Sequence, residues 1–249
     1  MVNSHIQMPR QVMKNFTNEN GQLYFYDFAT GDIHMGHPKT MYTEKGYFSD
    51  YVEDFLGANV ESDLGKLIKF IKESDFEVGD EPPVQYGDIA FNYVYSLIAR
   101  SPSFLKELNS NSVFYQFLPL TDQHDVAAHD GLIMAREKNI LRQYRISFLV
   151  NKSSEEIVLP TGGLTQYKYK IICPVTPKRA IVLDDIQVIE EGKNIVAVYE
   201  VKDKDAIHMI NQMSFIQEMK RDKKYVISGD RMLLQRLSDE VKSVQRELI

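Results

Sequence analysis

The amino-acid sequence predicts an α+β fold: a helix-rich first half with an early β-hairpin, a mainly antiparallel sheet in the second half, and a closing helix. Two observations predict it. Apolar residues recur at helical spacing in three long segments before residue 143, whereas short β-prone runs separated by Gly, Pro and charged turns follow that point. Helices gathered in one half and strands in the other are typical of α+β proteins, not of repeating β–α–β units.

The first element is a short helix over "PRQVMKNF", residues 9–16, with Pro9 at its first helical position. We expect Met13 and Phe16 to be buried, because burying an apolar side chain is the main force that can hold a short terminal segment. The segment then presents its polar groups to the main body of the protein: Arg10, Lys14 and Asn15. Whether these groups bind a ligand or only the protein itself is left open by the sequence.

A hairpin and three helices follow. The run "LYFYDF" predicts a strand, "ATGD" a turn and "IHMG" the returning strand. Ser49 is a suitable N-cap for a helix that extends to residue 73. A second helix is apolar on most sides, so we expect it to be buried, and it stops before Pro102. The helical segments are residues 49–73, 84–100 and 121–143.

The second half alternates between strands and turns before it returns to helix. Five short runs rich in β-branched and aromatic residues predict strands: residues 145–150, 155–160, 167–175, 179–184 and 194–201. A helix over 203–222, a short strand over 224–228 and a closing charged helix over 229–248 complete the chain. We predict one domain over residues 1–249, with a seam near residue 143 between a mostly helical part (1–143) and a mixed part (144–249).

Composition narrows the class of protein. The chain has 249 residues, 43% of them hydrophobic, so it can bury a substantial core. Its formal net charge of −6 argues against extended nucleic-acid binding. The sequence "MVNSHIQMPR" lacks the basic and apolar regions of a secretory signal, and no apolar run approaches membrane-spanning length. We therefore expect a cytoplasmic protein with no membrane partner.

Motifs for metal, cofactor or nucleophilic chemistry are not evident. His124 and His129 lie five residues apart, which places them on different faces of a helix, so a solvated helix start explains them better than a metal site. Neither a phosphate-binding glycine loop nor a nucleophile elbow occurs. Cys173 lies in an apolar run and reads as a buried structural thiol. No cofactor is evident, and the oligomeric state is not predicted.

Several polar residues nevertheless stand where they need partners. Arg100 closes the buried second helix, and we expect it to pair with an acid of the first long helix, Glu53 in preference to Glu61. The acids also read as part of a solvated acidic face. Asn211 interrupts an apolar helical stretch, so we expect its side chain to bond the backbone of another segment.

Six stretches in order resemble one bacterial and phage family, catalogued as domain of unknown function 4238. They are "PRQVMKNFT", "GQLYFYDFATGDI", "VEDFLGANVE", "ARSP", "YKIICPVTPKRAIVL" and "MINQMSFIQEMKRDKKYVIS". The family opens with His-Tyr-Val-Pro-x-x-Tyr-Leu-(Arg/Lys)-Asn-Phe and later carries Arg-x-Pro, Pro-Leu-Ser-Pro and a late asparagine. The resemblance covers most of the chain in patches and implies no established reaction.

The resemblance also indicates which residues of this chain correspond to the family's motifs. The matching residues are Pro9, Lys14, Asn15, Phe16, Asp27, Glu53, Glu61, Arg100, Pro102, Pro174, Pro177 and Asn211. Two departures stand out. Ile6 takes the place of the family's histidine, with His5 one residue early, and a family Ser-Asp-Asn-Pro is replaced near "VLPTGG" by a stretch without aspartate. If those two residues form a site in the family, this chain has rebuilt or lost it.

Three functions are compatible with the sequence. The first is a binding or regulatory module with a protein partner or a small anionic ligand, in a conflict between phage and bacterial host. The alternative is a hydrolase of nucleotides or nucleic acid, acting with or without a metal ion, and a structural subunit is the third. The hydrolase rests on Arg10, Arg100, Asp27, Glu53, Glu61 and a nearby His, any of which could converge in the fold. It requires Arg10, Asn15, Arg100 and an acid to meet in one concave pocket. The full set of candidate site residues is His5, Arg10, Lys14, Asn15, Asp27, Glu53, Glu61, Arg100 and Asn211.

Overall fold

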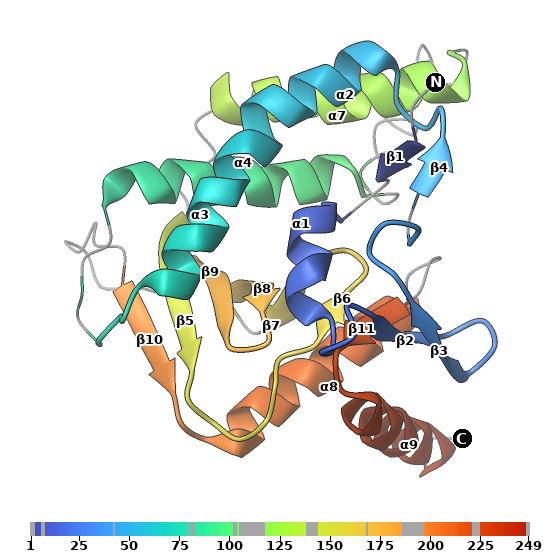
Figure 1. Ribbon diagram of the computed structural model, residues 1–249, viewed down its shortest axis with the longest axis vertical. Helices are drawn as coiled ribbons and strands as arrows, with labels where there is room; N and C mark the ends of the chain where they lie inside the picture. The colour runs from blue at the N-terminus through green and yellow to red at the C-terminus, as the bar shows by residue number, and fades with distance from the viewer. Residues whose placement is uncertain are drawn as a thin grey trace.

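The computed structural model confirms the α+β class (Figure 1). It describes residues 3–5, 8–41, 43–78, 80, 83–101, 104, 118–137, 144–167, 169–185, 197–220 and 225–247. Helices α2 (Asp50–Leu56), α4 (Val84–Ala99) and α7 (Leu120–Glu137) gather at one end of the molecule, and helices α8 (Lys204–Lys220) and α9 (Arg231–Glu247) lie at the opposite end, with the five-stranded and four-stranded sheets between them (Figure 1). Within the described part of the chain, no helix has the length and apolar character that a bilayer crossing requires.

The N-terminal element is helix α1 (Arg10–Met13), continued by a 3-10 turn (Lys14–Phe16). Pro9 is its N-cap and not its first helical residue, because the backbone of Pro9 is extended. Met13 and Phe16 are fully buried, which confirms that this segment is packed against the body. The predicted hairpin is also confirmed as strands β2 (Leu23–Asp27) and β3 (Asp32–Gly36), paired antiparallel.

The first long helix is interrupted. It runs as α2 (Asp50–Leu56), a π-helical turn (Gly57–Glu61) and α3 (Ser62–Glu73). The side chain of Ser49 accepts a hydrogen bond from the N–H of Val52, so the predicted N-cap is confirmed. Helices α4 (Val84–Ala99) and α7 (Leu120–Glu137) follow. Apolar residues of α2, the π-helical turn and α7 form one cluster, whereas α3 and α4 pack on the larger sheet.

The larger sheet has five strands in the order β10-β5-β9-β8-β7. Every pairing is antiparallel except β10 with β5, which is parallel. One face packs against α3 and α4, and the other face contributes Leu149, Ile172 and Val182 to a cluster with helix α8. The strands are β5 (Tyr144–Asn151), β7 (Thr165–Tyr167), β8 (Lys170–Thr176), β9 (Arg179–Asp185) and β10 (Ala197–Val201).

A smaller sheet joins the two halves of the chain in the order β3-β2-β11-β6. The N-terminal hairpin supplies two strands, and β6 (Leu159–Pro160) and β11 (Tyr225–Ser228) supply the others. Helices α8 (Lys204–Lys220) and α9 (Arg231–Glu247) pack beside this sheet. The main apolar core likewise contains residues from both sides of residue 143. The predicted strand over 155–160 shrinks to two residues, because the N–H groups of Ile157 and Val158 bond Pro177 and the Asn211 side chain and not a strand.

Candidate functional site

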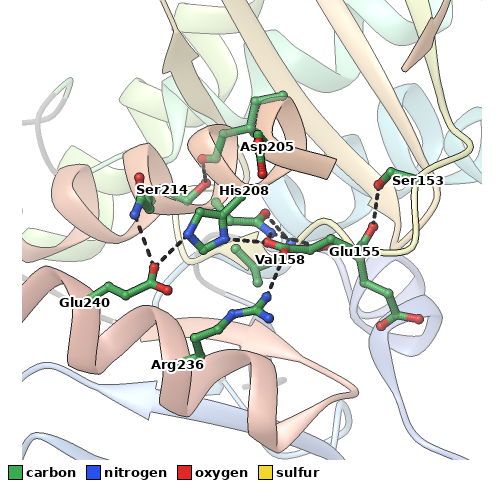
Figure 2. Close-up of polar contacts among 12 residues, drawn as sticks. Ser153, Glu155, Val158, Asp205, His208, Ser214, Arg236 and Glu240 are labelled. Carbon is green, nitrogen blue, oxygen red and sulfur yellow. Dashed lines mark hydrogen bonds and ion pairs between the residues drawn. The ribbon is translucent and has the colours of Figure 1, made fainter. Parts of the chain in front are cut away.

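A turn after β5 places a carboxylate against the two C-terminal helices. The N–H and hydroxyl of Ser153 donate to the side-chain oxygen of Asn151 at 2.9 and 2.7 Å, and the Asn151 amide donates to the Glu155 carbonyl at 2.7 Å. Such side-chain bonds to nearby backbone are the usual way in which Asn and Ser fix a turn. The turn therefore holds Glu155 in one position, facing helices α8 and α9 (Figure 2).

The Glu155 side chain is 1% exposed, and three donors surround it. Its Oε1 accepts from His208 Nδ1 at 2.9 Å and from Asn211 Nδ2 at 3.1 Å. Its Oε2 accepts from the guanidinium of Arg236 at 2.5 Å. A buried carboxylate is tolerated only when charge and hydrogen bonds compensate its lost hydration, and here both oxygens are compensated.

His208 continues the cluster to a second carboxylate. Its Nε2 lies 2.7 Å from Glu240 Oε2, which also accepts from the amide of Gln212 at 3.1 Å. His208 and Gln212 lie four residues apart on α8, and Arg236 and Glu240 lie four apart on α9, so each pair shares one helix face. The imidazole thus stands between two carboxylates, one from the turn and one from α9 (Figure 2).

Asn211 is fully buried and bonds two backbone groups of the segment that follows the turn. Its Oδ1 accepts from the N–H of Val158 at 3.0 Å, and its Nδ2 donates to the Glu156 carbonyl at 2.8 Å. The predicted side-chain bond to another segment is therefore confirmed. We call the five side chains that meet here the Glu155 cluster: Glu155, His208, Asn211, Arg236 and Glu240.

Sequence reasoning found one member of the Glu155 cluster and missed four. A signal for His208 was available, because it precedes Asn211 by three residues and so shares its helix face. Arg236 and Glu240 are also spaced as a pair on the closing helix. Nothing in the sequence joins Glu155 to them, since 81 residues separate Glu155 from Arg236.

Arg100 forms the predicted ion pair with the first long helix. Its guanidinium lies 3.2 Å from Glu61 Oε1, with side-chain exposures of 2% for Arg100 and 38% for Glu61. Among the contacts that the structure describes, the partner of Arg100 is therefore Glu61 and not Glu53, which the sequence favoured. Glu61 ends the π-helical turn and lies nearer the C-terminal end of α4. The carbonyl of Glu61 also accepts from the amide of Gln11, which ties α1 to the same place.

Two buried groups near this ion pair have ordinary core roles. Burial raises the pKa of the Tyr93 hydroxyl well above its usual value, and that hydroxyl lies 3.6 Å from the sulfur of Met8. Burial likewise raises the pKa of the Cys173 thiol, so the thiol stays protonated and unreactive near neutral pH. Cys173 is fully buried, as predicted.

The remaining candidate residues lie in other contacts. Asn15 donates to the Val175 carbonyl and accepts from Lys72, while Lys14 is exposed. Asp27 accepts from the N–H of Ala29 and so shapes the hairpin turn. The last three candidates lie apart from one another. Arg10 lies on α1, and its Nε is buried without a described partner. Glu53 is half-buried on α2. His5 ends strand β1 (Asn3–His5), which pairs with β4 (Thr43–Lys45), and it lies opposite Thr43.

The two histidines of "HDVAAHD" do not form a joint site. His124 is buried and stacks on Tyr47 with ring centroids 3.7 Å apart, so the expectation of a solvated helix start is wrong for this residue. His129 contacts Asp130 and the rings of Tyr51 and Phe55. Across the described residues, no three His, Cys, Asp or Glu side chains are grouped so that they could hold a metal ion.

The contacts thus join a subset of the candidates and leave others apart. Arg100, Glu61 and helix α1 meet at one place, Asp27 belongs to the hairpin, and Asn211 belongs to the Glu155 cluster. Comparison with family models, with curated proteins and with solved structures found no match to this chain. The resemblance to domain-of-unknown-function family 4238 therefore stays a prediction.

Proposed function

We propose that the protein is a cytoplasmic binding and regulatory module that acts in a conflict between phage and bacterial host, and that it does so without catalysing a reaction. One observation carries the proposal: the polar atoms of the Glu155 cluster face one another. A general acid or base must reach its substrate within about 2.6–3.2 Å. Both nitrogens of His208 already lie at such distances from carboxylates, at 2.9 and 2.7 Å.

The outer part of the Glu155 cluster supports a regulatory role. Arg236 and Glu240 are partly exposed, at 43% and 35% of their side chains, whereas the Glu155 carboxylate beneath them is buried. A small anionic ligand or an acidic group of a protein partner would compete with Glu155 for Arg236. Withdrawing a partner from a buried charge is costly, so binding at the surface would weaken the attachment of α9 to α8 and to the turn.

A phage challenge tests the proposal. Bacteria that express the wild-type chain, Arg236→Gln or Arg231→Gln are infected with a panel of phages, and plaques are counted. Arg231 is the matched control, because it is an exposed arginine on the same helix. We expect the wild type and Arg231→Gln to change plaque numbers at least tenfold for one phage, and folded Arg236→Gln to lose the effect. No change with the wild type, or an active Arg236→Gln, contradicts the proposal.

The alternative is a hydrolase of nucleotides or nucleic acid. The observation that favours it is the buried Arg100 guanidinium beside Glu61 on a π-helical turn, since such turns often occur at functional sites. The test incubates the purified protein with nucleoside triphosphates, DNA or RNA and with Mg²⁺ or Mn²⁺. Product formed by the wild type and by Glu73→Gln, but not by folded Glu61→Gln, would establish the hydrolase and refute the binding module. Glu73 is the control because it is an exposed acid on α3.

A further inference from the structure

A cavity of about 420 Å³ lies between the turn of the β2–β3 hairpin and the helices α8 and α9. These elements come together in the lower right of Figure 1. The volume is within the range of small-molecule sites, about 300–1,000 Å³. The cavity involves other residues of α8 and α9 than the Glu155 cluster does, so it is a separate feature of the same helix pair.

One wall of the cavity is aromatic. Tyr26, Phe28 and Phe215 each line it, and their rings contact one another. The centroid distances are 4.8 Å for Tyr26–Phe28, 5.4 Å for Tyr26–Phe215 and 5.5 Å for Phe28–Phe215. The rings come from the hairpin and from α8, so the wall exists only because these elements are packed together. Phe215 is fully buried and Tyr26 is 5% exposed, so these two rings back the half-buried ring of Phe28, against which a flat aromatic group can lie with favourable offset or edge contacts.

The helix α9 supplies a cation and a hydroxyl to the same cavity. The Lys242 ammonium lies 3.4 Å from the Gly31 carbonyl and 5.4 Å from the Tyr26 ring centroid, and no ion pair to it is found among the residues described. Ser238 lies one turn earlier and is 2% exposed, and its buried hydroxyl has no hydrogen-bond partner in the described structure. A buried polar group without a partner is uncommon and is explained when a ligand supplies the bond.

The hairpin turn keeps the Lys242 end of the cavity open. Gly31 has a positive φ of 77°, which glycine adopts without strain. A side-chain carbon at this position would lie 3.8 Å from both the Lys242 ammonium and the Tyr26 hydroxyl. The glycine therefore leaves the space beside the ammonium to a ligand.

We propose that this cavity binds a small aromatic carboxylate, with the ring against the aromatic wall and the carboxylate on Lys242, where it also accepts from the Ser238 hydroxyl. This assignment rests on the proposed binding function and names the ligand class that the function would use. An ammonium selects an anion, and the rings select a planar apolar group attached to it. The same two features could also take a nucleoside monophosphate, so the experiment compares both sources of an aromatic anion.

Titration calorimetry tests the ligand class on the folded wild-type protein. The probes are phenylacetate, indole-3-acetate, the neutral phenylacetamide and uridine monophosphate. We expect the two carboxylates to bind at least tenfold more tightly than the amide and than the nucleotide. Equal binding of acid and amide overturns the role of the ammonium, tighter binding of the nucleotide overturns the carboxylate, and no binding of either acid overturns the site. This comparison needs no variant, so a folding defect cannot obscure it.

Three variants then locate the binding. We expect Lys242→Gln to weaken the binding of indole-3-acetate at least tenfold and Ser238→Ala about threefold, because each removes one polar contact to the carboxylate. Lys202→Gln is the matched control, since this lysine is 80% exposed and pairs with Glu200 away from the cavity. Unchanged binding in folded Lys242→Gln, or an equal loss in Lys202→Gln, overturns the site.

Methyl signals of the methionines give an independent location. Met219 lines the cavity, whereas Met232 on α9 is exposed and does not line it. We expect indole-3-acetate to shift the Met219 methyl resonance and to leave Met232 unchanged; the reverse overturns the assignment. If carboxylates fail to bind while Arg236→Gln still abolishes the effect on phage, this site is wrong and the binding function stands. If the phage experiment fails while carboxylates still bind, the proposed role in phage conflict is wrong and this binding site stands.

Discussion

The protein buries two charged side chains in two different ways. In the helical region, the Arg100 side chain is almost fully buried, has a described ion pair to Glu61 at 3.2 Å, and leaves its Nε without a described partner. In the C-terminal region, Glu155 is equally buried but accepts hydrogen bonds from His208, Asn211 and Arg236. Among the residues that the structure describes, the same degree of burial is therefore compensated by few contacts in one region and by several in the other.

The difference follows from the two chemical groups. A guanidinium is delocalised and weakly hydrated, and it can lie against an aromatic ring, as Arg100 does over Phe48 at 6.0 Å. A carboxylate concentrates its charge on two oxygens, so it loses more hydration when it is buried and needs donors at both. We infer that a substitution in the Glu155 cluster lowers the unfolding free energy more than a substitution in the Arg100–Glu61 pair. The following substitutions test that difference.

The largest effect is expected for Glu155→Gln. The variant keeps the shape of the side chain but removes its charge, which leaves Arg236 without its counter-ion and replaces one hydrogen-bond-accepting oxygen with an NH2 donor, while His208 keeps its contact with Glu240. Breaking a buried ion pair by removing one partner costs about 3–5 kcal/mol of unfolding free energy, and we expect a loss at the lower end of this range because the Arg236 side chain left behind is 43% exposed. Urea unfolding followed by circular dichroism measures the loss. A cost no greater than that of Arg100→Met would break the comparison.

The next largest effect is expected for Asn211→Ala. Truncation leaves the Val158 N–H and the Glu156 carbonyl without the partners that they have in the protein. We expect the unfolding free energy to fall by about 2 kcal/mol, the cost of unsatisfied buried polar groups. Hydrogen exchange of the Val158 amide gives a local measurement, and an amide that stays protected in the variant would contradict the role of Asn211.

A smaller effect is expected for Arg100→Met. Methionine fills most of the same apolar space, and Glu61, at 38% exposure, reaches water once its partner is gone. We expect a change of about 1 kcal/mol or less in unfolding free energy, because a buried ion pair adds little over an apolar residue of similar volume. A loss above about 3 kcal/mol would place Arg100 with Glu155 and remove the distinction between the two regions.

The smallest effect is expected for Glu240→Gln. Glu240 is partly exposed, and glutamine can still accept a hydrogen bond from His208. Exposed ion pairs contribute about 0–1 kcal/mol, so the change in midpoint should be small. The exposed ion pair Lys66–Asp63 on α3 is the reference for a contact that adds nothing measurable to stability. We expect Lys66→Gln to leave the urea midpoint unchanged. A Glu240→Gln effect as large as that of Glu155→Gln would show that the partly exposed members of the cluster contribute as much to stability as the buried carboxylate.

The sequence predicted the local features of both regions. The hairpin, the Ser49 cap and the burial of Met13 and Phe16 follow from turn residues and apolar spacing, which act over a few positions. The pairing of Arg100 with an acid of the preceding helix could be predicted because the two helices are neighbours in the chain. The choice of Glu61 could not, since the π-helical turn changes the face that each acid presents.

Contacts between distant segments were beyond sequence reasoning. Asn211 was recognised as a residue that needs a partner, but Glu155 as its neighbour depends on a turn fixed by Asn151 and Ser153. A contact between distant segments also explains why β6 is short: the Asn211 side chain accepts from the Val158 N–H, which a longer strand would have used for pairing. The aromatic wall and Lys242 meet only after the hairpin packs on α8 and α9, so no local sequence pattern predicts the cavity.

The smaller sheet has a consequence for how the chain folds during synthesis. Strand β2 pairs on one side with its hairpin partner β3 but on the other with β11, which is made about 200 residues later. At about 5–20 residues per second, a ribosome needs roughly 10–40 s to cover that distance. Throughout this interval β2 has an unpaired edge, which can pair wrongly with other chains. Chaperone capture of nascent chains should therefore end only when β11 has left the ribosome.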